Sequence, residues 1–253
     1  MAKVGKMRVD QALVDRGLVE SRTKAQAMIM AGLVFSGEKK ILKSGDQIKD
    51  DQPLDVRGKE HPWVSRGGLK LAHGLSHFPI SVEGRVVADV GASTGGFTDV
   101  ALTNGAKKVY AIDVGHGQLA WKIRQDDRVV VMEKTNARHL SRDDIAEPID
   151  VVVCDASFIS LKTVLLAVLK LVAPGGDLIA LIKPQFEVGR ENVGKGGVVR
   201  DPALHKAVCD DIENWLSSLE GWTVLGITES PIKGPEGNIE FLIGAHYGDA
   251  NEA

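Results

Sequence analysis

DVGASTGGFTD, residues 89–99, begins with the last two residues of the apolar run RVVADV and contains three glycines close together. The β-branched and small residues of such a run are typical of a buried parallel strand. Gly91, Gly95 and Gly96 would let the backbone approach a ligand closely, although their spacing differs from the G-x-G-x-x-G pattern of dinucleotide sites. The stretch therefore predicts a strand that ends in a ligand-binding turn.

An acidic residue at the end of the next strand-like run, VYAID, supports this interpretation. Asp113 follows the glycine turn by about 20 residues, where a carboxylate can accept hydrogen bonds from both hydroxyls of a ribose. The combination predicts a site for a cofactor that contains adenosine, with nicotinamide dinucleotides and S-adenosylmethionine as candidates. The alternative is a tight turn that only connects a strand to a helix.

Strand-like and helix-like segments alternate downstream of the glycine turn, which predicts an α/β fold with a doubly wound parallel sheet. The last two strand-like segments, TVLGITESP and NIEFLIGAHY, are too close for a crossover helix, so one of them must be antiparallel. This ending resembles the Rossmann-like fold of the S-adenosylmethionine methyltransferases. The resemblance implies S-adenosylmethionine as the cofactor, lined also by Ser93, Thr94, Asn136 and Asp155.

The N-terminal segment differs in charge from the rest of the chain. The 253 residues carry a net charge of -3, yet residues 1–43 contain nine Lys and Arg against four Asp and Glu. RVDQALVDRG and RTKAQAMIMAG predict two short helices, each closed by a glycine, and short strand-like segments follow. We expect a small α+β RNA-binding module over 1–58, a linker over 59–68 and a catalytic domain over 69–253.

The order R-x-D-x-x-L, S-R-x-x-A and G-x-V/F-x-x-G resembles the RNA-binding module of a small-subunit ribosomal protein and many pseudouridine synthases. This resemblance implies a basic face that follows an RNA backbone. The implied phosphate contacts are Arg8, Arg22 and Lys24, with Lys39, Lys40 and Lys43 as weaker candidates, and Arg66 of the linker is added as an RNA contact. The alternative is an ordinary solvated basic surface.

Four ionisable residues form the candidate catalytic set: Lys70, Asp155, Lys183 and Glu240. A Lys-Asp-Lys-Glu set in this order resembles the FtsJ-type ribose 2′-O-methyltransferases. The hypothesis makes Lys183 the base for a ribose hydroxyl, with its neutral form favoured by the charge of Lys70 and by partial burial. Asp155 and Glu240 would orient the two amines. Taken alone, Lys70 and Glu240 could equally be solvated surface charges.

LIKPQFEVGRENVGKGGVVRDP, residues 181–202, together with HPWVSRGGLKL and CDASFISL, is similar to the TlyA family, sometimes labelled haemolysin A. The resemblance implies 2′-O-methylation of cytidine in ribosomal RNA, with ribosomal RNA or ribosomal subunits as partners. Phe158 and Phe186 are candidates for stacking on a displaced base. The alternatives are a pore-forming haemolysin, a non-catalytic assembly factor that binds ribosomal RNA, and a small-molecule methyltransferase.

The remaining features indicate a cytoplasmic protein without a metal site. Cys154 and Cys209 have no metal-ligand spacing, and alternation points Cys154 into the sheet. His73 and His77 share helical spacing but have no third ligand beside them. The N-terminus has no apolar signal region, and the longest apolar stretch is short of the roughly 20 residues of a membrane helix.

Overall fold

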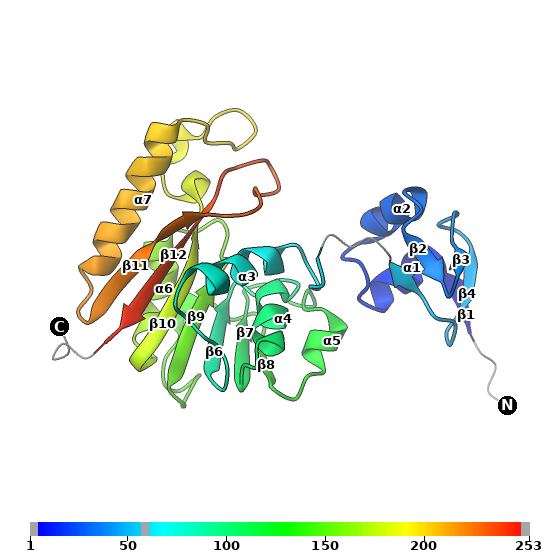
Figure 1. The fold of residues 1–253 in the computed structure, drawn as a ribbon, viewed down its shortest axis with the longest axis horizontal. Coiled ribbons are helices and arrows are strands. Elements are labelled where there is room, and N and C mark those ends of the chain that lie inside the picture. The colour runs from blue at the N-terminus through cyan, green and yellow to red at the C-terminus, as the bar shows by residue number, and fades with distance from the viewer. Residues whose placement is uncertain (1–4, 57–60, 249–253) are drawn as a thin grey trace.

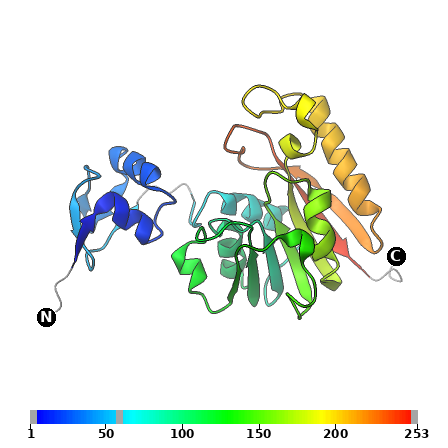
Figure 2. The same ribbon diagram turned by 180° about the vertical axis from the view of Figure 1, so that it is seen from behind.

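The computed structural model describes residues 5–56 and 61–248. They form a small N-terminal module and a larger α/β domain, which lie side by side with the module near the β8 and α5 end of the sheet (Figures 1 and 2). The expected boundary between the module and the linker, at residues 58 and 59, lies outside the described residues.

The small module contains two helices and two small sheets. Its elements are β1 (Lys6–Arg8), α1 (Val9–Asp15), α2 (Arg22–Met30), β2 (Val34–Ser36), β3 (Lys39–Lys40), β4 (Gln47–Lys49) and β5 (Asp55–Val56). Strand β1 pairs with β4, and β2 lies between β3 and β5. The side chain of Ser21 caps α2 by accepting a hydrogen bond from the Lys24 amide. Leu13, Ile29 and Ile48 are fully buried in a core of the module's own.

The larger domain is built on one seven-stranded sheet. The strands are β6 (Val86–Val90), β7 (Lys108–Ile112), β8 (Val129–Met132), β9 (Ile149–Cys154), β10 (Val172–Ile182), β11 (Trp222–Glu229) and β12 (Phe241–Tyr247). Their order is β11-β12-β10-β9-β6-β7-β8. Strand β12 is antiparallel to both of its neighbours, whereas the pairs from β10 to β8 are parallel. The prediction of a doubly wound sheet with an antiparallel last strand is therefore confirmed.

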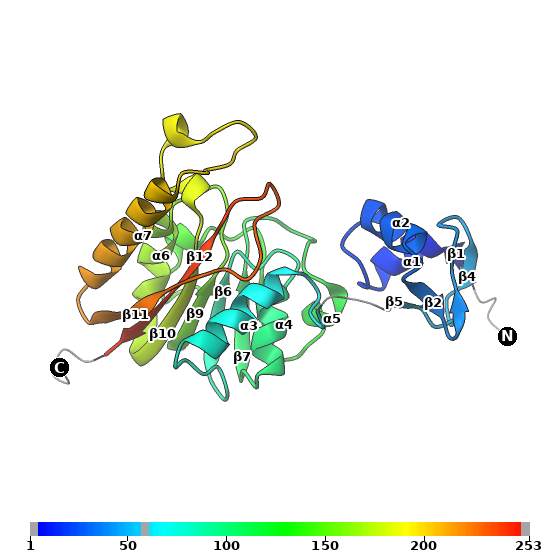
Figure 3. The same cartoon turned by 45° about the horizontal axis from the view of Figure 1, so that its top comes forward.

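Helices cover both faces of this sheet because its strands are apolar on both faces. They are α3 (Gly67–His77), α4 (Gly96–Thr103), α5 (Trp121–Arg124), α6 (Leu161–Leu169) and α7 (Pro202–Ser217). In β9, Val151 and Val153 face the core under α3 and α4, while Val152 and Cys154 face the core under α6 and α7 (Figure 3). Cys154 is fully buried, which confirms that it packs into the sheet.

Three elements differ from the sequence prediction. Helix α3 begins at Gly67, inside the expected linker, and its first turn lies so close to Gly96 that a Cβ on Gly96 would be 2.9 Å from the Gly68 amide nitrogen. The stretch GQLAWKIRQ, residues 117–125, has helical spacing, but helix α5 contains only four of these nine residues. The Ala120 amide is bonded to the Thr94 carbonyl, which holds the preceding segment in a turn. The run DLIALI, residues 177–182, predicts a strand of six residues, but strand β10 begins already at Val172, and the register of its pairing with β9 shifts between Val172 and Asp177.

The helices of the described residues include none with both the length and the apolar character needed to cross a membrane.

Candidate active site

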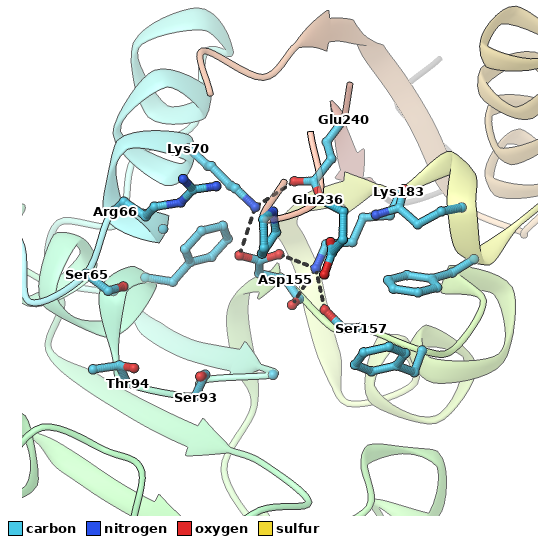
Figure 4. A pocket seen from close by; sticks show the side chains of 18 of the residues that line it. Ser65, Arg66, Lys70, Ser93, Thr94, Asp155, Ser157, Lys183, Glu236 and Glu240 are labelled. Atoms are coloured by element: carbon cyan, nitrogen blue, oxygen red, sulfur yellow. Dashed lines mark hydrogen bonds and ion pairs between the residues drawn. The ribbon is translucent and has the colours of Figure 1, made fainter. Parts of the chain in front are cut away.

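The candidate catalytic residues meet at one edge of the sheet. Asp155 and Lys183 directly follow the parallel strands β9 and β10, so both emerge at the carboxyl edge. Glu240 directly precedes β12, and because β12 is antiparallel its first residue lies at that same edge. Lys70 reaches the edge from α3 (Figure 4). The topology thus brings together four residues from distant parts of the chain.

These residues form a continuous ion-pair network. Lys70 Nζ lies 2.6 Å from Glu240 Oε2 and 3.4 Å from Asp155 Oδ2. Lys183 Nζ lies 2.6 Å from Asp155 Oδ1. The two lysines are each 6 % exposed and Glu240 is 2 % exposed. Opposite charges alternate along the network, which compensates for the desolvation of each group.

The Lys183 amine has two further contacts that fix its position. It donates to Ser157 Oγ at 2.8 Å and lies 3.1 Å from the Asp155 carbonyl oxygen. Ser157 was not among the sequence-predicted site residues, since a single serine in a loop forms no recognisable pattern. Its place two residues after Asp155 is the only signal that the sequence offers.

The glycine turn adopts the conformation that its residues favour. Gly91 has φ +84°, and a Cβ on it would lie 2.9 Å from the Ala156 backbone, so only glycine fits between the two loops. The amide of Ser93, which has φ +48°, donates to Asp113 Oδ2 at 2.8 Å. Asp113 Oδ1 accepts from the Gly115 amide at 2.7 Å. The Asp113 carboxylate is therefore held firmly beside the turn.

Two adjoining cavities lie over this turn. The first, of about 540 Å³, is lined by all four network residues and by Gly91, Ser93, Thr94, Gly96, Ser157, Phe158 and Phe186, among others. The second, of about 660 Å³, is lined by residues that include Asp113, Val114, Gln118, Asn136 and Arg138. Gly91, Ser93, Asp155, Ser157 and Phe158 line both. Together the cavities offer room for a nucleoside-sized cofactor beside a second ligand.

Gly95 is the one candidate cofactor residue that lines neither cavity. It precedes α4 with φ +95°, and a Cβ on it would lie 2.9 Å from the Leu119 side chain. Its glycine is explained by the left-handed turn and by the packing of the Leu119 segment. The structure thus gives Gly95 a role in shaping the turn, and its assignment to the cofactor stays a prediction.

Two buried groups below the site have altered acidity. Asp89 in β6 is fully buried, and this burial raises its pKa to about 7. Asp89 Oδ2 accepts a hydrogen bond of 2.6 Å from Thr98 Oγ1. Burial also raises the pKa of the Cys154 thiol to about 12, so it stays protonated at neutral pH.

The candidate RNA contacts divide between two places. Arg8 and Arg22 each form an ion pair with buried Asp10, at 2.9 and 3.0 Å, while their own side chains remain about half exposed. The hydrogen bond from Arg8 holds the pKa of the Asp10 carboxyl well below its usual range. Lys24 pairs with Glu20 at 3.2 Å. Arg66 instead donates to the Lys233 carbonyl and lines the first cavity, away from the basic module's core.

The profile of the FtsJ-like methyltransferase family matches residues 63–247, and the S4 domain profile matches residues 7–52. The chain belongs to the FtsJ-like methyltransferase family. Its resemblance to the TlyA family is also confirmed by its relatives.

This FtsJ-like methyltransferase is 51 % identical over 243 residues to the Bacillus subtilis protein named "Putative rRNA methyltransferase YqxC", covering 96 % of this chain and 86 % of the other. It is 47 % identical over 237 residues to the 16S/23S rRNA (cytidine-2'-O)-methyltransferase TlyA of Mycobacterium tuberculosis, covering 93 % and 88 %. A solved structure described as "Putative hemolysin from Streptococcus thermophilus" superposes with a TM-score of 0.74 at 44 % identity, over 98 % of this chain and 90 % of that one.

Proposed function

We propose that this protein transfers a methyl group from S-adenosylmethionine to the ribose 2′ hydroxyl of a cytidine in ribosomal RNA, and that it acts in the cytoplasm. The observation that carries the proposal is the buried network of Lys70, Asp155, Lys183 and Glu240 at the wall of the first cavity. The methyltransferase family and the activity named for the Mycobacterium tuberculosis relative support it.

The residues around the glycine turn fit S-adenosylmethionine. A Cβ at Gly91 would collide with the Ala156 backbone, and the adjoining Ser93 amide is already fixed on Asp113, so the turn is shaped before a ligand arrives. We assign the methionine end of the cofactor to Gly91, Ser93 and Thr94, and the adenosine end to Asp113 and Asn136. When bound, the cofactor supplies an electrophilic methyl group on its sulfonium.

Lys183 is the residue that we assign to the proton of the ribose hydroxyl. This hydroxyl is a weak nucleophile at neutral pH and must lose its proton as it reacts. Asp155 and Ser157 hold Lys183 Nζ at 2.6 and 2.8 Å, so its free lone pair has a defined direction when the amine is neutral. Asp155 divides its carboxylate between two amines, with Oδ1 at 2.6 Å from Lys183 Nζ and Oδ2 at 3.4 Å from Lys70 Nζ. Alignment of the hydroxyl supplies the rest of the acceleration.

The small basic module would dock the enzyme on ribosomal RNA. Arg8 and Arg22 are oriented by buried Asp10, and their guanidinium groups are about half exposed. An arginine that is fixed by one carboxylate and still exposed can direct its remaining N–H groups at a phosphate. The S4 domain match supports RNA as the partner of this module.

An aromatic pair at the cavity mouth suits a base that has left its helix. The Phe158 side chain is 89 % exposed, and its ring centroid lies 5.0 Å from that of Phe186. Phe158 also has φ +64°, an unfavourable conformation for a bulky residue. We propose that Phe158 stacks on the target base while the ribose lies near Lys183.

The deciding experiment incubates the full-length protein with ribosomal subunits and methyl-labelled S-adenosylmethionine. Label in alkali-resistant dinucleotides would establish ribose methylation, because a 2′-O-methyl group blocks alkaline cleavage of the adjacent phosphodiester. Subunit binding without label transfer would favour an assembly factor. Equal methylation of a free nucleoside would favour a small-molecule methyltransferase, and lysis of erythrocytes without methylation would favour a haemolysin.

A further inference from the structure

Asn238 connects two loops that border the first cavity. Its side chain lies in the loop between β11 and β12, and the residue is 1 % exposed. Asn238 Oδ1 accepts from the Val199 amide at 3.0 Å, and Asn238 Nδ2 donates to the Gly197 carbonyl at 2.9 Å. Both functional groups of this buried amide therefore bind the backbone of one other segment.

That segment is a short hairpin, residues 193–199, which we call the cavity hairpin. Its two sides are joined by the bridge between Gly194 and Val198, in which the Gly194 amide donates to the Val198 carbonyl at 3.1 Å. Val193 and Gly197 line the first cavity, the one that contains the catalytic network. The end of the hairpin is held also by His205, whose Nε2 lies 2.9 Å from the Val199 carbonyl oxygen.

The cavity hairpin and its flanks are cationic. Arg190, Lys195 and Arg200 are all exposed, and within the described part of the chain none of them forms an ion pair with an acidic side chain. None of these three cations lines the first cavity itself, but they lie in the chain on either side of Val193 and Gly197, which do. Exposed cations next to such a border are suited to the phosphates of an RNA strand whose nucleotide occupies the cavity. Their usefulness depends on a fixed position of the hairpin, whose glycines give it little rigidity of its own.

The position of Asn238 also links the cavity hairpin to the catalytic network. Glu240 follows Asn238 by two residues and makes the 2.6 Å ion pair with Lys70. The Glu240 carbonyl accepts from the Ser230 amide at 2.9 Å, so this end of the loop is itself anchored. A single short segment therefore carries a network carboxylate and the amide that holds the hairpin.

We propose that Asn238 is a positioning residue for the RNA substrate: it holds the cationic cavity hairpin at the border of the cavity, in register with Glu240 and Lys70. This inference rests on the proposed function, since it takes RNA as the substrate. It predicts that loss of the Asn238 amide weakens the productive binding of RNA and leaves the cofactor site intact.

The first test uses trypsin and needs no RNA. Exposed Lys195 and Arg200 are cleavage sites whose reactivity reports opening of the cavity hairpin. In full-length protein, Asn238→Ala removes both hydrogen bonds and is expected to accelerate cleavage at these sites about tenfold. Asn238→Asp keeps an acceptor for Val199 and should give an intermediate rate. Ser230→Ala is the matched control, because Ser230 is buried in the same loop. Among the described residues, its hydroxyl bonds only to the Ile232 backbone of that loop, donating to the carbonyl at 2.8 Å and accepting from the amide at 3.4 Å.

The second test measures methyl transfer to ribosomal subunits. For Asn238→Ala we expect the KM for ribosomal subunits to rise about tenfold, with a much smaller change in kcat. The Kd for S-adenosylmethionine should not change, and this unchanged cofactor binding would also show that the variant is folded. Ser230→Ala should match the wild type in all three.

Unchanged trypsin cleavage in Asn238→Ala would overturn the hairpin contact, and faster cleavage with an unchanged KM would overturn its role toward RNA. A wild type that methylates no RNA would overturn the proposed function and this role together, while the trypsin rates would still decide the hairpin contact.

Discussion

Lys70 Nζ and Glu240 Oε2 are 2.6 Å apart in space, although the two residues are 170 positions apart in the sequence. With Asp155 and Lys183 they form a row of alternating charges, each of which is mostly buried. The desolvation of each charge is compensated by the opposite charge beside it. The row is therefore sensitive to the loss of any single member.

Glu240→Gln should lower the free energy of unfolding by about 3 kcal/mol. This value is at the lower end of the range for breaking a buried ion pair, because Lys70 keeps its ion pair with Asp155. The double variant Lys70→Met and Glu240→Gln should recover most of this stability and still lack methyl transfer. Urea unfolding and the transfer assay measure the two effects. The control is the exposed pair Lys162–Asp211, whose disruption should cost at most about 1 kcal/mol. Additive losses in the double variant would show that the two residues are not coupled.

Lys183→Ala should slow methyl transfer by about 10² to 10⁴ while S-adenosylmethionine still binds, because the proton acceptor is lost and the cofactor contacts are not. Lys183→Arg should be similarly slow, since a guanidinium stays protonated. Single-turnover rates and calorimetric cofactor binding check both. A near-normal rate in Lys183→Arg would remove the base role from this residue.

Phe158→Ala should leave stability unchanged, because the side chain is 89 % exposed. Loss of one aromatic–base stack, about 1–3 kcal/mol, should raise the KM for ribosomal subunits by about 5- to 150-fold, whereas Phe158→Tyr should retain binding. Leu166→Ala, on an exposed position of α6, is the control for loss of surface apolar area. Equal KM values for Phe158→Ala and the wild type would refute stacking.

Asp89→Asn should change how stability depends on pH. With its pKa raised to about 7, folded Asp89 keeps a proton that the unfolded chain loses above about pH 4. This residue therefore lowers the free energy of unfolding progressively from pH 4 to pH 7, and the full penalty persists above pH 7. The stability of the variant relative to the wild type should accordingly rise between about pH 4 and pH 7 and stay level above pH 7. Parallel pH profiles in urea unfolding would contradict the assignment.

Gly91→Ala should destabilise the protein and weaken cofactor binding, because its Cβ would meet the Ala156 backbone at 2.9 Å. Gly84→Ala isolates the backbone strain, since Gly84 has a similar φ of +69° and open space around its Cβ position. The clash should add about 1–3 kcal/mol beyond the Gly84→Ala value. Thermal unfolding and cofactor titration of both variants measure the difference. Equal losses of stability in the two variants would mean that the loops move apart at Gly91 without an energetic cost.

Strand-end residues could be predicted from the sequence because their positions follow from local patterns. Asp155 and Lys183 each terminate an apolar run, and parallel strands bring such ends to one edge. The short connection before β12 predicted that one of the last two strands is antiparallel. The structure shows that this strand is β12, which explains why Glu240 reaches the same edge. The roles of these residues in catalysis stay predictions for the experiments above.

Contacts that depend on tertiary packing could not be predicted in the same way. Asn238 lies in a polar loop sequence that is typical of a turn, and only the fold brings it to Val199 and Gly197. The glycine pattern alone did not show that Gly95 packs against the Leu119 side chain, because a glycine that approaches a ligand and one that is needed for packing look the same in a sequence. The short helix α5 reflects a backbone contact with Thr94 that overrides local propensity.

The insertion of β12 between β10 and β11 has a consequence for biosynthesis. During translation β11 leaves the ribosome first and has no neighbour in the sheet until β12 arrives to fill the space beside β10. Glu240 directly precedes β12 and is synthesised 170 residues after Lys70, so the 2.6 Å ion pair between them can form only late in translation. The four-residue network of the candidate active site can therefore form only after β12 has been synthesised and has paired with β10.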